Sequence, residues 1–393
     1  FSLTDPLICA IYANDVDEKT TWAEALAEVA RDRPLTQFSP DTCNLITRSA
    51  WDADAVYVTY QNRALPGGHL YADRSHFNLS AHGRYWGIYR TLRQAREHYK
   101  AGNRSVVMID GQGASTAPAK CVACEDRPQA TFIATDLRVT WDYSSNYVEP
   151  AEDRSKTVSM PFSRNHFRLE PSRVPWMDLP TEELPDWLTS RKPQPLGNNP
   201  SPFTGWTRRT PGIVRAFRTF GMIRGPHPYV LVLDDIELDG LPHDYSWNFT
   251  VADDVVIGST KMVGGADWPM AQIVLDEASP PSRGSDRHLL IRFLEGRGLS
   301  ADRPAVIETV ALPDGPGGRA MTFPKLVVRA RSEAPNFKAI LLPYRAGDAL
   351  PKTTWNADHT VLSVAWPDQN DRIAFAQGED GRTLPRIIRN DTA

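Results

Sequence analysis

Cysteine is scarce in this chain of 393 residues, which contains only Cys9, Cys43, Cys121 and Cys124. Four scattered cysteines are too few for the disulfide framework of a small secreted domain. The segment Cys121-Val-Ala-Cys124 has the spacing of a redox motif or of half a zinc site, but no second pair accompanies it. It lies between a turn and a predicted strand and opens no helix. We therefore expect ordinary packing or a local thiol pair there.

The chain also lacks a long hydrophobic run and an excess of positive charge. No stretch of about 18 consecutive apolar residues occurs, which argues against a transmembrane helix. The 44 Lys and Arg residues are outnumbered by 48 Asp and Glu residues, which gives a net charge of −4. Because no positive field surrounds the whole molecule, we expect neither a nucleic-acid partner nor a membrane partner. An anionic ligand would need a local cluster of cations.

Helix-forming sequence is confined to the start of the chain. Trp22, Ala25, Leu26 and Val29 follow a helical spacing, which predicts a short helical segment within residues 1–38. Residue 1 is Phe and no signal-peptide pattern follows it. We therefore expect a chain that is processed, truncated or part of a longer protein.

Proline is abundant instead, and 32 prolines with 25 glycines favour short strands joined by turns. Apolar runs and period-two alternation predict ten strands, at residues 55–60, 76–80, 105–110, 130–135, 213–220, 229–233, 288–293, 326–329, 339–342 and 361–364. Residues 39–393 are therefore predicted to form a mainly β domain of stacked antiparallel β-sandwich sheets, with a candidate subdivision near residue 280. A proline-rich surface excursion is expected between residues 175 and 210.

Polar residues gather after two glycines, Gly67 and Gly68. His69, Tyr71 and Asp73 alternate there, so an extended chain would place their side chains on one face. A His, a Tyr and an Asp on one face suit an acid/base group with its orienting partner. The alternative is a hydrogen-bonded cluster at the entry of a strand.

A local cluster of cations follows at once. The six cations share twenty-one residues with a single acid, Glu97, and are interleaved with aromatic residues; they are Arg84, Arg90, Arg93, Arg96, Lys100 and Arg104. Guanidinium groups bind carboxylates and sulfates at two points, and aromatic rings stack on sugar faces. An anionic polymer is therefore a candidate ligand. The alternative is a solvated segment with ion pairs to acids elsewhere.

Asp234 and Asp235 follow a very apolar segment. Adjacent carboxylates could suggest hydrolysis, but neighbouring residues of a strand point to opposite faces. We interpret one of them as a cap of the following turn.

Several motifs occur in a distinctive order: Arg48-Ser-Ala-Trp51, Gly68-His69, Asp73, Ala81-His-Gly-Arg84, Arg104-Ser-Val-Val-Met-Ile-Asp110 and Val214-Arg-Ala-Phe-Arg218. Together they resemble the central signature of heparinase II/III-like polysaccharide lyases over roughly residues 40–250. The resemblance implies an N-terminal (α/α) toroid joined to a C-terminal β-sandwich, with the active site between them. Residues 1–38 would then be the end of the toroid, and a separate helical toroid polypeptide is a candidate partner.

The resemblance also implies a reaction and its residues. Such lyases cleave acidic, uronate-containing polysaccharides by β-elimination, which implies a periplasmic or secreted location and no redox cofactor. His69 matches the first histidine of the family's cleft-facing segment, and Tyr99 resembles a tyrosine used as acid or base. Tyr71, Arg74, Arg90 and Arg104 are the candidates for substrate binding. A non-catalytic carbohydrate-binding sandwich is the alternative, and a hydrolase is a third option.

Many family members bind a structural zinc ion, and this sequence departs from their pattern. Tyr71 and Arg104 stand where two zinc-binding histidines are expected. Neither a phenol nor a guanidinium replaces a zinc-bound imidazole. We therefore predict that this zinc ion is absent.

Overall fold

A computed structural model describes residues 33–40, 42–62, 72–89, 101–115, 119–147, 173–174, 203–208, 212–263, 269–278, 286–295, 298–299, 304–312 and 321–389. Antiparallel strands dominate these residues, as the composition predicts. The helical elements among them are one turn of α-helix, α3 (Arg138–Asp142), and one turn of 3-10 helix, η3 (Ala101–Asn103). The expected mainly β architecture is therefore confirmed.

Two sheets are built from strands that are close in sequence. The first sheet has the order β1 (Thr36–Ser39), β2 (Asn44–Arg48), β3 (Tyr57–Gln61), β4 (His76–Ala81) and β5 (Arg84–Gly87). The outer sheet has the order β22 (Lys352–Trp355), β23 (Val361–Ala365), β24 (Asn370–Gln377) and β25 (Thr383–Arg389). Both are simple antiparallel meanders.

The other sheets combine distant segments. The central sheet has the order β16 (Val255–Val263), β17 (Met270–Glu277), β18 (Arg287–Phe293), β21 (Phe337–Arg345), β14 (Tyr229–Glu237), β13 (Arg215–Ile223), β9 (Ala130–Asp136) and β8 (Lys120–Asp126). The groove sheet has the order β19 (Ala305–Leu312), β20 (Met321–Ser332), β15 (His243–Thr250), β6 (Val107–Ile109) and β7 (Gln112–Gly113). A small sheet joins β10 (Tyr143–Tyr147), β12 (Phe203–Arg208) and β11 (Arg173–Val174).

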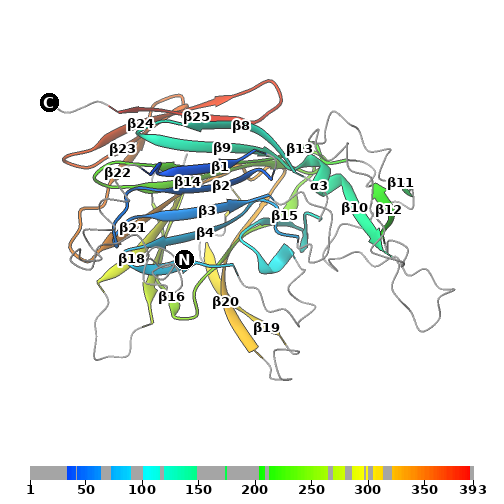
Figure 1. Ribbon diagram of the computed structural model, residues 1–393, viewed down its shortest axis with the longest axis horizontal. Coiled ribbons are helices and arrows are strands. Elements are labelled where there is room, and N and C mark those ends of the chain that lie inside the picture. The colour runs from blue at the N-terminus through cyan, green and yellow to red at the C-terminus, as the bar shows by residue number, and fades with distance from the viewer. Residues whose placement is uncertain are drawn as a thin grey trace, which may run out of the picture.

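The central sheet is the middle layer, with the outer sheet on one face and the first and groove sheets on the other (Figure 1). Its strand β14 shows why: Val230 and Val232 pack toward the first and groove sheets, while Leu231 and Leu233 pack toward the outer sheet. All but the last residue of this strand are buried, as expected for a strand covered on both faces. The described residues therefore form a large hydrophobic core on each side of the central sheet, besides a small cluster of Ala72, Ala101, Val106 and Met108.

Each of the ten predicted strands coincides with an observed strand. Near the expected boundary at residue 39, β1 begins at Thr36 and pairs with β2 from that residue. On either side of the candidate division near residue 280, β17 and β18 pair with each other in one sheet. The expected domain boundaries stay predictions. The helical segment predicted before residue 33 lies outside the described residues, as does most of the excursion at 175–210, within which β12 is found.

Two local interpretations change as well. Asp234 and Asp235 both lie inside β14, so neither caps a turn, and they do point to opposite faces as expected. Asp234 accepts hydrogen bonds from Arg218 and Trp247, whereas Asp235 accepts two from Thr383 of the outer sheet. The Cys121–Cys124 segment lies within β8 itself and not between a turn and a strand.

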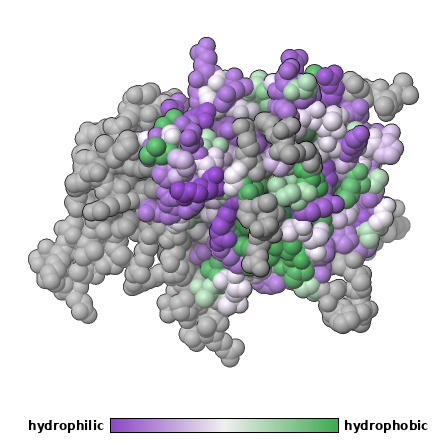
Figure 2. All heavy atoms as spheres, turned by 180° about the vertical axis from the view of Figure 1, so that it is seen from behind, coloured by the Kyte–Doolittle hydropathy of each residue, from purple (hydrophilic) through white to green (hydrophobic). Residues whose placement is uncertain are grey.

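The surface is mixed in character. Seen from behind, hydrophilic residues surround smaller hydrophobic areas on the described surface (Figure 2). The large apolar side chains that are exposed are scattered along the chain: Tyr85, Val214, Leu241, Val256, Leu350 and Ile388. No helix among the described residues is long and apolar enough to cross a membrane.

Candidate functional site

The two polar segments singled out in the sequence meet in space. Tyr89 donates a hydrogen bond of 2.7 Å from its hydroxyl to Oδ2 of Asp73, and Arg74 pairs with Oδ1 of the same carboxylate at 3.1 Å. The guanidinium carbon of Arg104 lies 4.4 Å from the centre of the Tyr89 ring, a cation–π contact. Asp73, Arg74, Tyr89 and Arg104 therefore form one cluster, called the buried cluster below.

His76 fixes the geometry of this cluster from β4. Its Nδ1 accepts a hydrogen bond of 2.9 Å from the backbone N–H of Ser105, so the proton of a neutral ring is on Nε2, which lies 3.1 Å from Oδ1 of Asn78. The ring also meets Tyr89 edge-on, with 4.9 Å between ring centres. His76 is fully buried. It holds residues 89 and 105 in place and has no access to solvent.

Beneath the buried cluster, Arg218 of β13 ties three segments together. Its Nε and Nη2 donate hydrogen bonds of 2.6 and 2.8 Å to the two carboxylate oxygens of Asp234. Its Nη1 donates to the backbone carbonyls of Ser75 and Ser105, at 2.8 and 2.7 Å. Since the side chain is fully buried, this bidentate pair anchors the cluster to the central sheet.

The predicted site residues fall into two groups. His69, Tyr71, Arg90 and Tyr99 lie outside the described residues, and their proposed roles stay predictions. Arg74 and Arg104 are described, and both are only 1% exposed and engaged with protein groups. Their guanidinium groups contact Asp73 and Tyr89, and their expected role in substrate binding stays a prediction.

The described residues do not fit the structural zinc ion that the family resemblance implies. No group of three or more His, Cys, Asp and Glu residues among the described positions is arranged to hold a metal ion. At one of the two expected ligand positions, Arg104 places a cation against Tyr89. The carboxylate of Asp73 is bonded to Arg74 and Tyr89. A second cation beside these groups would be repelled by the guanidinium groups.

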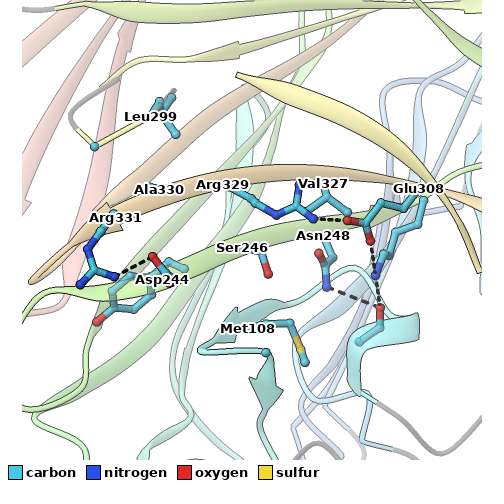
Figure 3. A pocket seen from close by; sticks show the side chains of 15 residues that line it. Met108, Asp244, Ser246, Asn248, Leu299, Glu308, Val327, Arg329, Ala330 and Arg331 are labelled. Atoms are coloured by element: carbon cyan, nitrogen blue, oxygen red, sulfur yellow. Dashed lines mark hydrogen bonds and ion pairs between the residues drawn. The ribbon is translucent and has the colours of Figure 1, made fainter. Parts of the chain in front are cut away.

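A groove of about 640 Å³ lies next to the buried cluster, on the face of the groove sheet turned away from the core (Figure 3). Strand alternation creates it. On β15, Trp247 and Phe249 enter the core while Ser246 and Asn248 line the groove. On β20, the buried Leu326 and Val328 alternate with groove residues, which are Lys325, Val327, Arg329 and Arg331.

The cations of the groove are partly balanced by acids. Arg331 pairs with Asp244 at 2.9 Å, and Glu308 pairs with Arg329 and, at 3.6 Å, with Lys325. Arg329 and Arg331 have side chains that are 58% and 66% exposed. Three cations face two acids, so the groove carries a local positive charge and its two arginines are open to solvent.

The groove adjoins Gly102, which follows the predicted site residue Tyr99 in the sequence. Lys325 donates a hydrogen bond of 2.9 Å to the carbonyl oxygen of Gly102, and Asn248 Nδ2 lies 3.5 Å from the same oxygen (Figure 3). Burial lowers the pKa of Lys325, against the opposing effect of Glu308. Gly102 is three residues after Tyr99 and two before Arg104. The groove and the buried cluster are therefore two parts of one region.

Sequence reasoning did not identify the groove residues. The signal was present in β20, where Lys325, Arg329 and Arg331 occupy alternate positions of one strand face. The apolar run Leu326-Val-Val328 hides this alternation of charged residues, because it indicates only a buried strand. Ser246 and Asn248 carry no such signal, since only the pairing of β15 with β20 brings them beside the cations.

Comparisons with family models and with curated proteins find no match. Solved structures are similar, however. Heparan sulfate lyase HepC from Pedobacter heparinus aligns with a TM-score of 0.52 and 11% identity, over 91% of this chain and 42% of that chain. A mutant of the same lyase aligns with a TM-score of 0.51 and 10% identity, over 92% and 43%. The chain thus has the β-sandwich fold of these polysaccharide lyase structures and spans less than half of their length.

Proposed function

We propose that this chain is the β-sandwich part of a polysaccharide lyase that cleaves an acidic, uronate-containing glycosaminoglycan by β-elimination. The observation that carries the proposal is the groove of β15 and β20, which contains exposed arginines and whose Lys325 bonds to Gly102, three residues after Tyr99 in the sequence. The fold shared with heparan sulfate lyase structures supports the same substrate class. A periplasmic or secreted location follows from the substrate.

β-Elimination places three demands on a site. A base removes the proton on C5 of the uronate, the bond between C4 and O4 breaks, and a double bond forms between C4 and C5. The carboxylate must be neutralised, because proton removal otherwise builds up an uncompensated dianion. An acid then protonates O4 of the leaving sugar. The net products are a shorter chain and an unsaturated uronate.

In this proposal His69 and Tyr99 are the base and the acid, which remove the C5 proton and protonate O4. A phenol with a pKa of about 10 acts as a base only where nearby cations favour its phenolate. Arg90 and the groove arginines supply that charge and meet the substrate carboxylate, and Tyr71 contacts the sugar. Arg74 and Arg104 hold Asp73 and Tyr89 in place.

The experiment is an elimination assay on the protein at its natural length. Heparan sulfate, alginate and glucuronan are supplied in turn, and the ultraviolet absorbance of the unsaturated uronate is followed. We expect His69→Ala and Tyr99→Phe to lower the rate by about 10²-fold or more, the usual contribution of a general acid or base. Tyr344→Phe, on β21, is the matched control and should keep the wild-type rate. Wild-type rates in both site variants would remove these residues from the mechanism.

A non-catalytic carbohydrate-binding sandwich is the second candidate. It is favoured by Arg104 at an expected metal-ligand position. It predicts saturable binding of the polymer without a new double bond, even when a helical toroid polypeptide is added. Copurification of such a helical polypeptide, with absorbance gained in its presence, would instead favour the lyase.

A further inference from the structure

The described residues contain three cysteines, and all of them lie between the first sheet and the central sheet. Cys43 precedes β2 and is buried, while Cys121 and Cys124 lie on β8 and are partly exposed. Cys43 belongs to the larger hydrophobic core, and Cys121 packs against that core. The sequence alone paired Cys121 with Cys124, but the fold brings in a third thiol from 78 residues earlier.

A β-bulge in β8 decides which way these thiols face. Cys121 lies opposite Thr135 and Cys124 lies opposite Ile133, with the register shifted between residues 121 and 123. Thr135 and Ile133 are two residues apart on β9 and share a face, so their partners Cys121 and Cys124 share that face as well. It is the face turned to the first sheet, because Tyr60 of β3 donates a hydrogen bond of 3.0 Å to the Thr135 hydroxyl.

Cys43 is held against this face. Its sulfur lies 3.8 Å from the hydroxyl of Thr135, the residue directly opposite Cys121. Asn62 donates from Nδ2 to the carbonyl oxygen of Cys43 at 3.3 Å, to its sulfur at 3.7 Å and to the Thr135 hydroxyl at 3.0 Å. The thiol of Cys43 is therefore fixed beside the thiol of Cys121.

The contact between the thiols of Cys43 and Cys121 shifts their pKa values in opposite directions. A hydrogen bond from Cys43 lowers the pKa of Cys121, and the same contact, with burial, raises the pKa of Cys43. Burial also raises the pKa of Cys124, to about 11. The partly exposed Cys121 is thus the thiol that forms a thiolate, the reactive form in disulfide exchange.

We propose that Cys43 and Cys121 are a redox-active pair that forms a disulfide between the first sheet and the central sheet. The thiolate of Cys121 attacks a low-molecular-weight disulfide and releases one thiolate. The sulfur of Cys43 then attacks the mixed disulfide on Cys121, and its proton goes to the second leaving thiolate. In total, two protein thiols are oxidised, one small disulfide is reduced, and two small thiols are released.

Cys124 does not replace Cys43 in this pair. Residues that share a face of one strand stay about 6.5 Å apart with parallel side chains, whereas bridged cysteines need Cβ atoms about 3.8 Å apart. The bond between residues 43 and 121 closes a long loop, so it restricts the unfolded chain and stabilises the folded protein.

The test treats the chain with oxidised glutathione, blocks free thiols by alkylation and maps unreduced peptides by mass spectrometry. We expect a peptide pair joining residues 43 and 121, with Cys124 alkylated. Alkylation of both Cys43 and Cys121, or a bond that joins either one to Cys9 or Cys124, would overturn the proposal.

Two variants sharpen the result. Cys43→Ser should leave Cys121 as a mixed disulfide with glutathione, whereas Cys124→Ser should still form the bond. Reduction should lower the Tm of the oxidised wild type and of Cys124→Ser but not that of Cys43→Ser. An equal effect of reduction on all three proteins contradicts the assignment, and the wild-type peptide map decides the matter even where a variant does not fold.

Discussion

Among single residues, Arg218 connects the site region to the central sheet. It donates to Asp234 of the neighbouring strand and to carbonyl oxygens of two segments that border the buried cluster. The sequence shows an arginine in an apolar strand and two adjacent aspartates sixteen residues later, but nothing in it links them. Their pairing depends on the register of β13 with β14, where Arg218 lies opposite Asp234.

The Arg218→Met variant should lose about 3–5 kcal/mol of unfolding free energy, because a buried carboxylate is left without its partner. Arg215→Met is the matched control on the same two strands. Arg215 pairs with Glu237, but this pair is about one-fifth exposed, so the loss should stay below about 1 kcal/mol. Urea unfolding followed by tryptophan fluorescence measures both. Equal losses of unfolding free energy in the two variants would show that burial does not make the Arg218–Asp234 pair contribute more than the Arg215–Glu237 pair.

Among elements, the β6–β7 hairpin shows how a dipeptide sets a turn. The dipeptide Asp110-Gly111 signals a tight turn, and both residues have positive φ, at 49° and 74°. The sequence did not predict the two contacts of His243 that hold this turn, called the His243 clamp below. His243 of β15 lies 2.7 Å from Asp110 through Nδ1 and 2.8 Å from Asp239 through Nε2.

The His243 clamp predicts a pH dependence of stability. Burial lowers the pKa of His243, but the hydrogen bonds and charges of Asp239 and Asp110 outweigh that effect and raise it. A folded-state pKa above the unfolded value of about 6.5 stabilises the protein fully below that pH, and the stabilisation is lost as pH rises through the folded-state pKa. Thermal unfolding from pH 5 to 9 should therefore depend less on pH in His243→Gln. An unchanged profile would mean that the imidazolium contributes nothing.

Strand prediction succeeded where burial on at least one face leaves a pattern in the sequence. The ten predicted strands all lie in the interior of their sheets, and none is an edge strand. The edge strand β16 explains why, since most of its side chains are exposed or half-buried and no period-two pattern results. β8 is half-buried throughout its first five residues and gives no alternation either. Edge strands depend on backbone pairing with a neighbour that the sequence does not identify.

At the scale of the whole molecule, the candidate site is assembled from three distant parts of the chain. Residues 73–104 supply the buried cluster, residues 218–248 supply its anchor and one groove strand, and residues 308–331 supply the groove cations. The sequence predicted the first part through its local density of polar residues. The others could not be predicted, because sheet order alone brings β15 and β20 beside the segment that ends in Arg104.

Binding of heparan sulfate to this chain tests the central claim most directly, because the claim is that an acidic polymer lies along the groove. A titration compares the wild type with the double variant Arg329→Gln/Arg331→Gln. Arg372→Gln is the control, since Arg372 is an exposed arginine on β24 of the outer sheet.

We predict that the double variant weakens binding by about 5- to 30-fold at low salt, since each of the two exposed charges contributes about 0.5–1 kcal/mol and Asp244 and Glu308 are then left to repel the polymer. Added salt should weaken wild-type binding and narrow the difference. Arg372→Gln should bind like the wild type. Equal affinity of the wild type and the double variant, or an equal loss in Arg372→Gln, would contradict the account.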